Sequence, residues 1–234
     1  MRSACLLGLI LMKSLLAQSN TSVDRILEEA NASYRQLRSE DAVRLYREYL
    51  QLYPERADVH VFLGAALLNM NQPNEAMKEA ESAIQIDHRL AKAYVVEGRV
   101  FTARQQWNAA MRSLETAVTL APQDSDAWYF LGRAAYEANR FEKAIDSFDH
   151  AMRAGGQQSR VYEGLGLSYE ALAHYGEAER AYRRAVELAG SAYRPSFALG
   201  RFLFKQGRAE ESLPFFETAL RLSPGTPEIC FEFG

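Results

Sequence analysis

The chain has 234 residues, of which 48% are hydrophobic and 24% charged. This balance can bury a core and excludes a globally disordered chain. The 27 basic and 30 acidic residues leave a net charge of -3, so no positive excess predicts a nucleic-acid partner.

The first residues differ in composition from the rest of the chain. Arg2 precedes an apolar run over residues 4–12, and Ala17 is a small residue at a plausible cleavage position. This order is typical of a secretory signal peptide, so we predict a signal over residues 1–19 and a bacterial protein exported to the periplasm or beyond. Lys13 interrupts the apolar segment, and an uncleaved N-terminus would leave the protein cytoplasmic. The run is shorter than the roughly 20 residues of a membrane span, and no span is expected after signal removal.

Small residues then recur with a fixed period along the remaining chain. Glycines stand 34 residues apart at Gly64, Gly98, Gly132, Gly166, Gly200 and Gly234. Alanines follow the same step at Ala42, Ala76, Ala110, Ala144 and Ala178. A shared register of this kind indicates tandem repeats. We predict six repeats over residues 20–226, with an incomplete seventh at 227–234. Their bounds are 23–56, 57–90, 91–124, 125–158, 159–192 and 193–226.

Each repeat has the pattern of two amphipathic helices. In the fourth repeat, spacings of three, one and three place four residues on one helical face: Trp128, Leu131, Gly132 and Ala135. A second face follows the break at residues 139–141, with Ala144, Phe148 and Ala151. Glycine or alanine at these points lets two helices approach closely, and the apolar side of each pair requires the next pair to cover it.

The period and the order Trp–Leu–Gly, Ala–Phe–Ala resemble the tetratricopeptide-repeat family. The resemblance covers residues 23–234 and implies an all-α fold, a right-handed superhelical solenoid of helix-turn-helix repeats. It also implies a protein-binding scaffold in which the first helix of each repeat lines the concave face.

Prolines and glycines mark the predicted helix ends. Five of them follow the second helix of a repeat: Pro54, Pro122, Pro224, Gly156 and Gly190. Pro195 suits the first turn of a helix, whereas Pro214 lies inside one and should kink or shorten it.

The seventh repeat stops without a polar capping helix. Its apolar residues Ile229, Phe231 and Phe233 would then need a cover, so the chain is shortened, or a partner or second copy covers them. Self-association through this end is therefore one expectation.

No catalytic or metal-binding constellation occurs. The phosphate loop, the zinc-binding H-E-x-x-H helix and the G-x-S-x-G nucleophile elbow are all absent from the sequence. The four histidines lack the spacing of metal ligands: His60, His88, His150 and His174. His60 takes the place that Trp128 has in its repeat, as does Cys230, so packing is the expected role of both. We predict that the protein is not an enzyme and that it binds neither a cofactor nor a metal.

The candidate binding surface follows from the family's concave face. Positions 2, 5, 9, 12 and 13 of each first helix form one stripe. In the third to sixth repeats this stripe is basic and aromatic, with Lys92, Arg99, Tyr129, Arg133, Tyr136, Arg160, Arg194, Phe197, Arg201, Phe204 and Lys205. We predict that it binds a peptide with acidic and apolar side chains. The alternative is that its arginines pair with neighbouring acids, as Arg99 with Asp126 or Arg133 with Glu163.

Two functions fit these observations. The first is a non-enzymatic adaptor that binds a protein or peptide partner at the bacterial cell envelope. The alternative is the substrate-recognition arm of a larger enzyme, such as a glycosyltransferase, of which this chain is a part.

Overall fold

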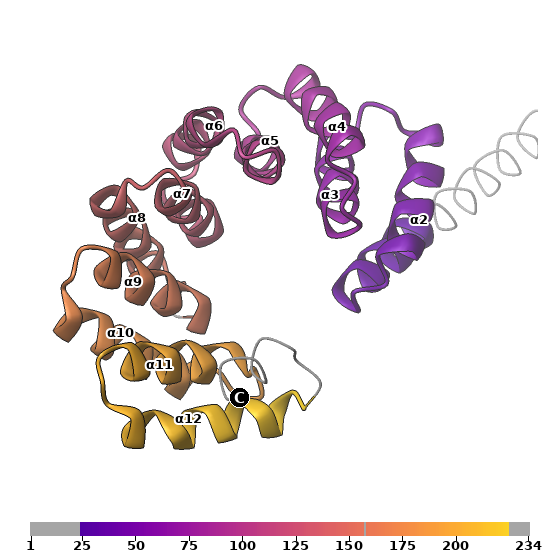
Figure 1. Ribbon diagram of the computed structural model, residues 1–234. Helices are drawn as coiled ribbons and strands as arrows, with labels where there is room; N and C mark the ends of the chain where they lie inside the picture. The colour runs from indigo at the N-terminus through magenta and orange to yellow at the C-terminus, as the bar shows by residue number, and fades with distance from the viewer. Residues whose placement is uncertain (1–23, 157, 225–234) are drawn as a thin grey trace, which may run out of the picture. The chain divides into compact units, whose positions relative to one another are not determined.

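The computed structural model describes residues 24–156 and 158–224, which form α-helices and no strand (Figure 1). A first helix covers residues 24–35 of this range. It is followed by α2 (Ser39–Leu52), α3 (Ala57–Asn69), α4 (Pro73–Ile86), α5 (Ala91–Ala103), α6 (Trp107–Leu120), α7 (Ser125–Glu137), α8 (Phe141–Arg153), α9 (Ser159–Ala171), α10 (Tyr175–Leu188), α11 (Arg194–Lys205) and α12 (Ala209–Leu222). The expected all-α repeat fold is confirmed.

The helices divide into two compact parts, an N-terminal part (Met1–Gln105) and a C-terminal part (Gln106–Gly234). From α2 to α5 and from α6 to α12, each helix packs on the next one in sequence. Alternate helices also meet, because α3 contacts α5, α7 contacts α9, and α9 contacts α11. The first helices of successive repeats therefore lie beside one another, which is the stacking of a repeat solenoid.

The glycine and alanine series lie where the two helices of a repeat cross. The alanines from Ala42 to Ala178 are fully buried. A Cβ added to Gly166 would lie 2.6 Å from the Tyr182 ring, and one added to Gly132 would lie 2.7 Å from the Phe148 ring. Glycine recurs at this position because a large aromatic side chain of the second helix packs against the backbone of the first.

The turn inside each repeat depends on one residue with left-handed backbone angles. It is the fifteenth residue of each repeat: Leu37, Asn71, Gln105, Asn139, Ala173 and Gly207. In the fourth repeat the Arg140 N–H donates to the Ala135 carbonyl at 2.8 Å, which satisfies a carbonyl at the helix end. This is the hydrogen bond of a Schellman motif.

A side chain at the fourth position of a repeat holds the turn between repeats. Trp128 Nε1 donates to the Pro122 carbonyl at 2.8 Å, and His60 Nε2 lies 2.9 Å from the Pro54 carbonyl. His60 thus makes the same contact as the tryptophan whose place it takes, a hydrogen bond that the sequence analysis did not predict.

Predicted helix ends agree with the structure, with one exception. Helices α2, α6 and α12 end shortly before a proline, and Pro195 lies in the first turn of α11. Pro214, however, does not shorten α12, which keeps 14 residues like α10. Pro214 and Glu210 are both exposed, so the Glu210 carbonyl that loses its intrahelical donor lies on the water-facing side.

Some predicted features lie outside the described residues. They are the signal segment over residues 1–19, the start of the seventh repeat at 227–234, and Cys230 within it. Within the described ranges, no helix combines the length and the apolar character that crossing a membrane requires.

Candidate protein-binding groove

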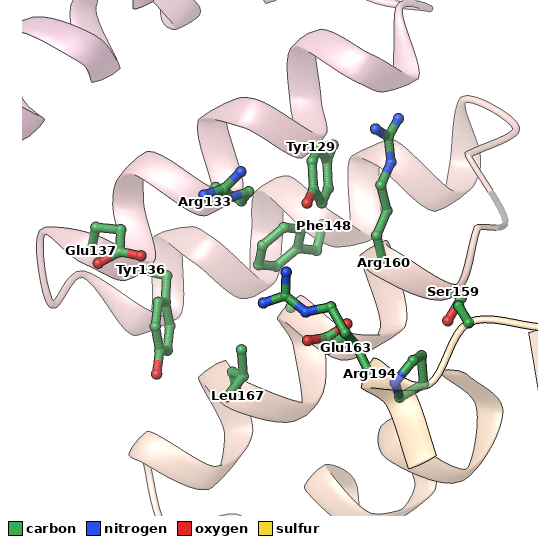
Figure 2. A pocket seen from close by; sticks show the side chains of 13 residues that line it. Tyr129, Arg133, Tyr136, Glu137, Phe148, Ser159, Arg160, Glu163, Leu167 and Arg194 are labelled. Atoms are coloured by element: carbon green, nitrogen blue, oxygen red, sulfur yellow. The ribbon is translucent and has the colours of Figure 1, made fainter. Parts of the chain in front are cut away.

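A cavity of about 410 Å³ opens on the first helices of the C-terminal part (Figure 2). Helices α7, α9 and α11 supply most of its lining, and Phe148 comes from α8. Its residues are Tyr129, Arg133, Tyr136, Glu137, Phe148, Ser159, Arg160, Glu163, Gly164, Leu167, Ala192, Arg194 and Pro195. We call this cavity the groove.

The helical period positions the side chains of the groove. On α7, Tyr129, Arg133 and Tyr136 follow a spacing of four and three, so they share one face. On α9, Arg160, Glu163 and Leu167 follow a spacing of three and four, and they share one face as well. The groove is therefore formed by the same face of successive first helices, as the family's concave surface implies.

The floor of the groove depends on a glycine outside the repeating series. Phe148 is 1% exposed and lies beneath α9. A Cβ at Gly164 would lie 2.5 Å from the tip of this ring, so only glycine lets the ring reach the groove. Because the ring is almost fully covered, it supports the floor from within the core, and the partly exposed Tyr129 and Tyr136 supply the aromatic surface that a ligand could contact.

Arg160 is held in place by two neighbours. It forms an ion pair with Asp126, and its guanidinium carbon lies 4.4 Å from the centre of the Tyr129 ring. Its Nε is buried and has no hydrogen-bond acceptor among the described residues. Arg160 thus lines the groove, but Asp126 already compensates its charge. For this arginine, the alternative that the stripe arginines pair with neighbouring acids holds.

Arg133, Arg194 and Glu163 are charged but form no close pair. In the described part of the chain, no hydrogen bond or ion pair joins any of the three to another residue. The prediction that Arg133 and Glu163 form an ion pair is therefore wrong, since the two charges interact only at longer range. Burial raises the pKa of the Glu163 carboxyl, although the charges of Arg194, Arg201 and Arg133 oppose that shift.

Five of the eleven predicted stripe residues line the groove: Tyr129, Arg133, Tyr136, Arg160 and Arg194. On α11 and outside that lining lie Phe197, Arg201, Phe204 and Lys205. Lys92 and Arg99 lie on α5, in the N-terminal part.

The α11 residues outside the lining have different environments. Phe197 is partly buried and packs edge-on against Phe216, with ring centres 5.9 Å apart. Lys205 Nζ contacts Glu170 Oε1 at 3.0 Å, and Tyr182 donates to the other Glu170 oxygen at 2.8 Å. Phe204 is exposed.

The sequence reasoning missed the floor of the groove. Gly164 had a detectable signal, because other repeats carry Phe62, Val96, Phe130 and Ala198 at the same position. A glycine that breaks the repeat pattern marks a place where backbone or ring must approach closely. Phe148 had no such signal, because large aromatic residues are common at its position.

Metal binding has no support in the described residues. No group of three or more histidine, cysteine, aspartate or glutamate side chains there could hold an ion.

Several solved structures have the same fold as this chain. Pseudomonas aeruginosa PilF aligns with a TM-score of 0.73 and 21% identity, over 92% of this chain and 97% of that one. The Cut9–Hcn1 hetero-tetramer of the APC/C gives a TM-score of 0.81 at 16% identity, over 93% of this chain and 45% of that chain. YrrB, described as a tetratricopeptide-repeat protein with an unusual peptide-binding site, gives 0.58 at 16% identity, over 80% and 96%. These similarities show the fold alone.

The sequence also matches one family model. No curated protein matches it, but residues 8–228 match the model of the Cilia and flagella-associated protein 70 C-terminal domain, a tetratricopeptide-repeat domain. Repeat solenoids of this type generally act as non-catalytic scaffolds for protein–protein interaction, through the extended surfaces that stacking creates. Because the match covers almost the whole chain, the chain belongs to the tetratricopeptide-repeat family of this domain.

Proposed function

We propose that this chain is a non-enzymatic adaptor that holds a peptide segment of a partner protein in the groove. The observation that carries the proposal is the combination of partly exposed aromatic rings with unpaired cations. Tyr129 and Tyr136 supply the rings, while Arg133 and Arg194 have no hydrogen-bond or ion-pair partner among the described residues.

The chemistry of the lining defines the segment that it would bind. Guanidinium groups bind carboxylates through two parallel hydrogen bonds, and tyrosine offers a rigid ring with a polar end. Tyr129 and Tyr136 stand on the same helix as Arg133. A segment with acidic and apolar side chains in alternation fits these residues. The peptide-binding site named for YrrB supports peptide binding as a use of this fold.

We infer that the adaptor works at the bacterial cell envelope. The support is the N-terminal sequence, in which Arg2, an apolar run and Ala17 occur in the order of a signal peptide. N-terminal sequencing of the purified protein tests this location: a chain that begins after Ala17 or Ser19 supports export, and a chain that retains Arg2 contradicts it.

Site-specific photo-crosslinking in cells tests the binding proposal. A benzoylphenylalanine in place of Tyr136, inside the groove, should crosslink a partner protein. The same residue in place of Tyr175, which is exposed and outside the groove lining, is the matched control and should not. Adding the Arg133→Ser and Arg194→Ser substitutions should abolish the Tyr136 crosslink while the far-ultraviolet circular dichroism stays unchanged.

Two results would contradict the proposal. One is an equal crosslink from both positions, because contact would then not depend on the groove. The other is a crosslink that persists in the double arginine variant.

A further inference from the structure

The groove holds a negative charge of its own at the place where an acidic ligand would bind. We propose that Arg133 and Arg194 bind a carboxylate of the partner peptide and that Glu163 competes with it, so that loss of the Glu163 charge tightens binding. This inference rests on the proposed function and names both the ligand group and the residue that limits its affinity.

Three successive first helices place these charges around one space. Glu163 is on α9, Arg133 on α7 and Arg194 at the start of α11. Figure 2 shows Arg194 and Glu163 extending toward the space beside the Phe148 ring, with Arg133 across it. The charges of both arginines act on the Glu163 carboxyl. A ligand carboxylate that binds these arginines must therefore come close to Glu163.

Arg133 and Arg194 differ from the third arginine of the groove in having no ion-pair partner among the described residues. Arg160 also lines the groove, but Asp126 already occupies its guanidinium. Neither Arg133 nor Arg194 has such a partner among the described residues. Their donors are thus available to an incoming carboxylate, whereas those of Arg160 are partly used.

Glu163 attracts these arginines without closing a pair with either of them. An established ion pair would hold the carboxylate charged and lower its pKa. Here burial dominates instead and raises the pKa of the Glu163 carboxyl, despite three nearby cations. An additional carboxylate would be attracted by the arginines and repelled by Glu163. Water screens the attraction in part, because both arginines are exposed, and screens the half-buried Glu163 less.

The other charged and titratable groups that face this site do not replace Glu163. They are Tyr129, Tyr136 and Glu137 from α7, Arg160 from α9 itself, and Arg201 from α11. Glu137 is exposed, and its charge is not among those that act on the Glu163 carboxyl. Glu163 is therefore the carboxylate whose charge a bound ligand would meet.

The Glu163→Gln substitution tests the inference, because glutamine keeps the shape and removes the charge. The probe is a set of labelled peptides that carry glutamate, glutamine or lysine at one position between leucines. The variant should bind the glutamate peptides roughly threefold to thirtyfold more tightly than the wild type, and the gain should shrink near 1 M salt, where screening reaches about 3 Å. Binding of the glutamine peptides should not change.

Glu142→Gln is the matched control. Glu142 is an exposed carboxylate on α8 outside the groove lining, so its loss changes the net charge equally and should leave the affinities unchanged. If Glu163→Gln leaves glutamate-peptide binding unchanged or weakens it, this inference is overturned while the proposed function stands. If neither protein binds any peptide and Tyr136 captures no partner, the proposed function fails, and the inference with it.

A pH series provides an independent readout on the wild-type protein. The glutamate of the probe is replaced by cysteic acid, whose sulfonate stays charged at low pH. Because a raised pKa makes Glu163 take up a proton early as the pH falls, wild-type affinity should rise toward that of Glu163→Gln. The variant itself should show a flat profile over the same range. Parallel profiles for the two proteins would overturn the inference.

Discussion

At the residue scale, His60 combines its place in the repeat pattern with a hydrogen-bonded, titratable ring. Its ring lies between two acceptors, with Nδ1 2.6 Å from Glu79 Oε2 and Nε2 2.9 Å from the Pro54 carbonyl. Only the protonated ring can donate to both. The hydrogen bond with Glu79 raises the pKa of His60 above its ordinary value, and burial opposes this rise without cancelling it.

This arrangement predicts a pH-dependent stability. Because the folded pKa of His60 is raised, the stabilisation is complete below the unfolded pKa of about 6.5 and is lost as pH rises through the folded pKa. Glu79→Gln should therefore lower the free energy of unfolding by about 1–2 kcal/mol near pH 6 and by much less near pH 9.

Denaturant unfolding of both proteins at several pH values measures this difference. Glu81→Gln, at an exposed position of the same helix, is the control and should show no such dependence. A Glu79→Gln effect that is constant across the pH range would show that the pair does not titrate.

The helix–turn–helix element depends on a backbone conformation that most residues adopt at a cost. Ala173 has a φ of 58° and Gly207 a φ of 76° at the same position of successive repeats. The left-handed region costs a residue with a Cβ roughly 1–2 kcal/mol, and glycine nothing. The turn between α9 and α10 is therefore under more strain than the turn between α11 and α12.

We expect Ala173→Gly to raise the free energy of unfolding by about 1 kcal/mol, and Gly207→Ala to lower it by a similar amount. A Cβ at position 207 meets nothing within 4 Å, so the second change isolates the backbone effect. Thermal and denaturant unfolding measure both. If both substitutions raised, or both lowered, the free energy of unfolding, the left-handed backbone angle would not be the source of the strain.

At the scale of the whole molecule, the last described helix differs from its counterparts in exposure. Leu213 and Leu220 of α12 are 46% and 42% exposed. The equivalent Met111 and Val118 in the third repeat are buried. A repeat protein buries such faces under the next repeat, and an open one favours association.

The sequence predicts self-association through the C-terminal end, and we expect the exposed leucines of α12 to take part in it. Light scattering after size-exclusion chromatography tests this expectation. The wild-type mass should rise with concentration. The double variant Leu213→Glu, Leu220→Glu should stay monomeric, while Leu52→Glu, at an exposed leucine of α2, should behave like the wild type. A single monomer mass for the wild type at all concentrations would refute the prediction.

The sequence by itself determined the repeat fold, because its period is local. Two helices of fixed spacing, with Gly132 facing Phe148 and a turn at Asn139, follow from residues within one repeat. The expected shortening at Pro214 did not occur, and sequence alone does not say that this proline lies on the water-facing side of its helix.

The tertiary structure decided which stripe residues form a site. Side chains with the same repeat position differ in their partners: Asp126 compensates Arg160, whereas Arg194 stays unpaired among the described residues. Gly164 likewise has its effect through a contact between helices, because it leaves room for the Phe148 ring of α8. Such differences depend on distances between helices far apart in the sequence, which a 34-residue period cannot encode. The register thus predicted the face on which the groove lies, and packing between neighbouring repeats determined which of its charges are paired.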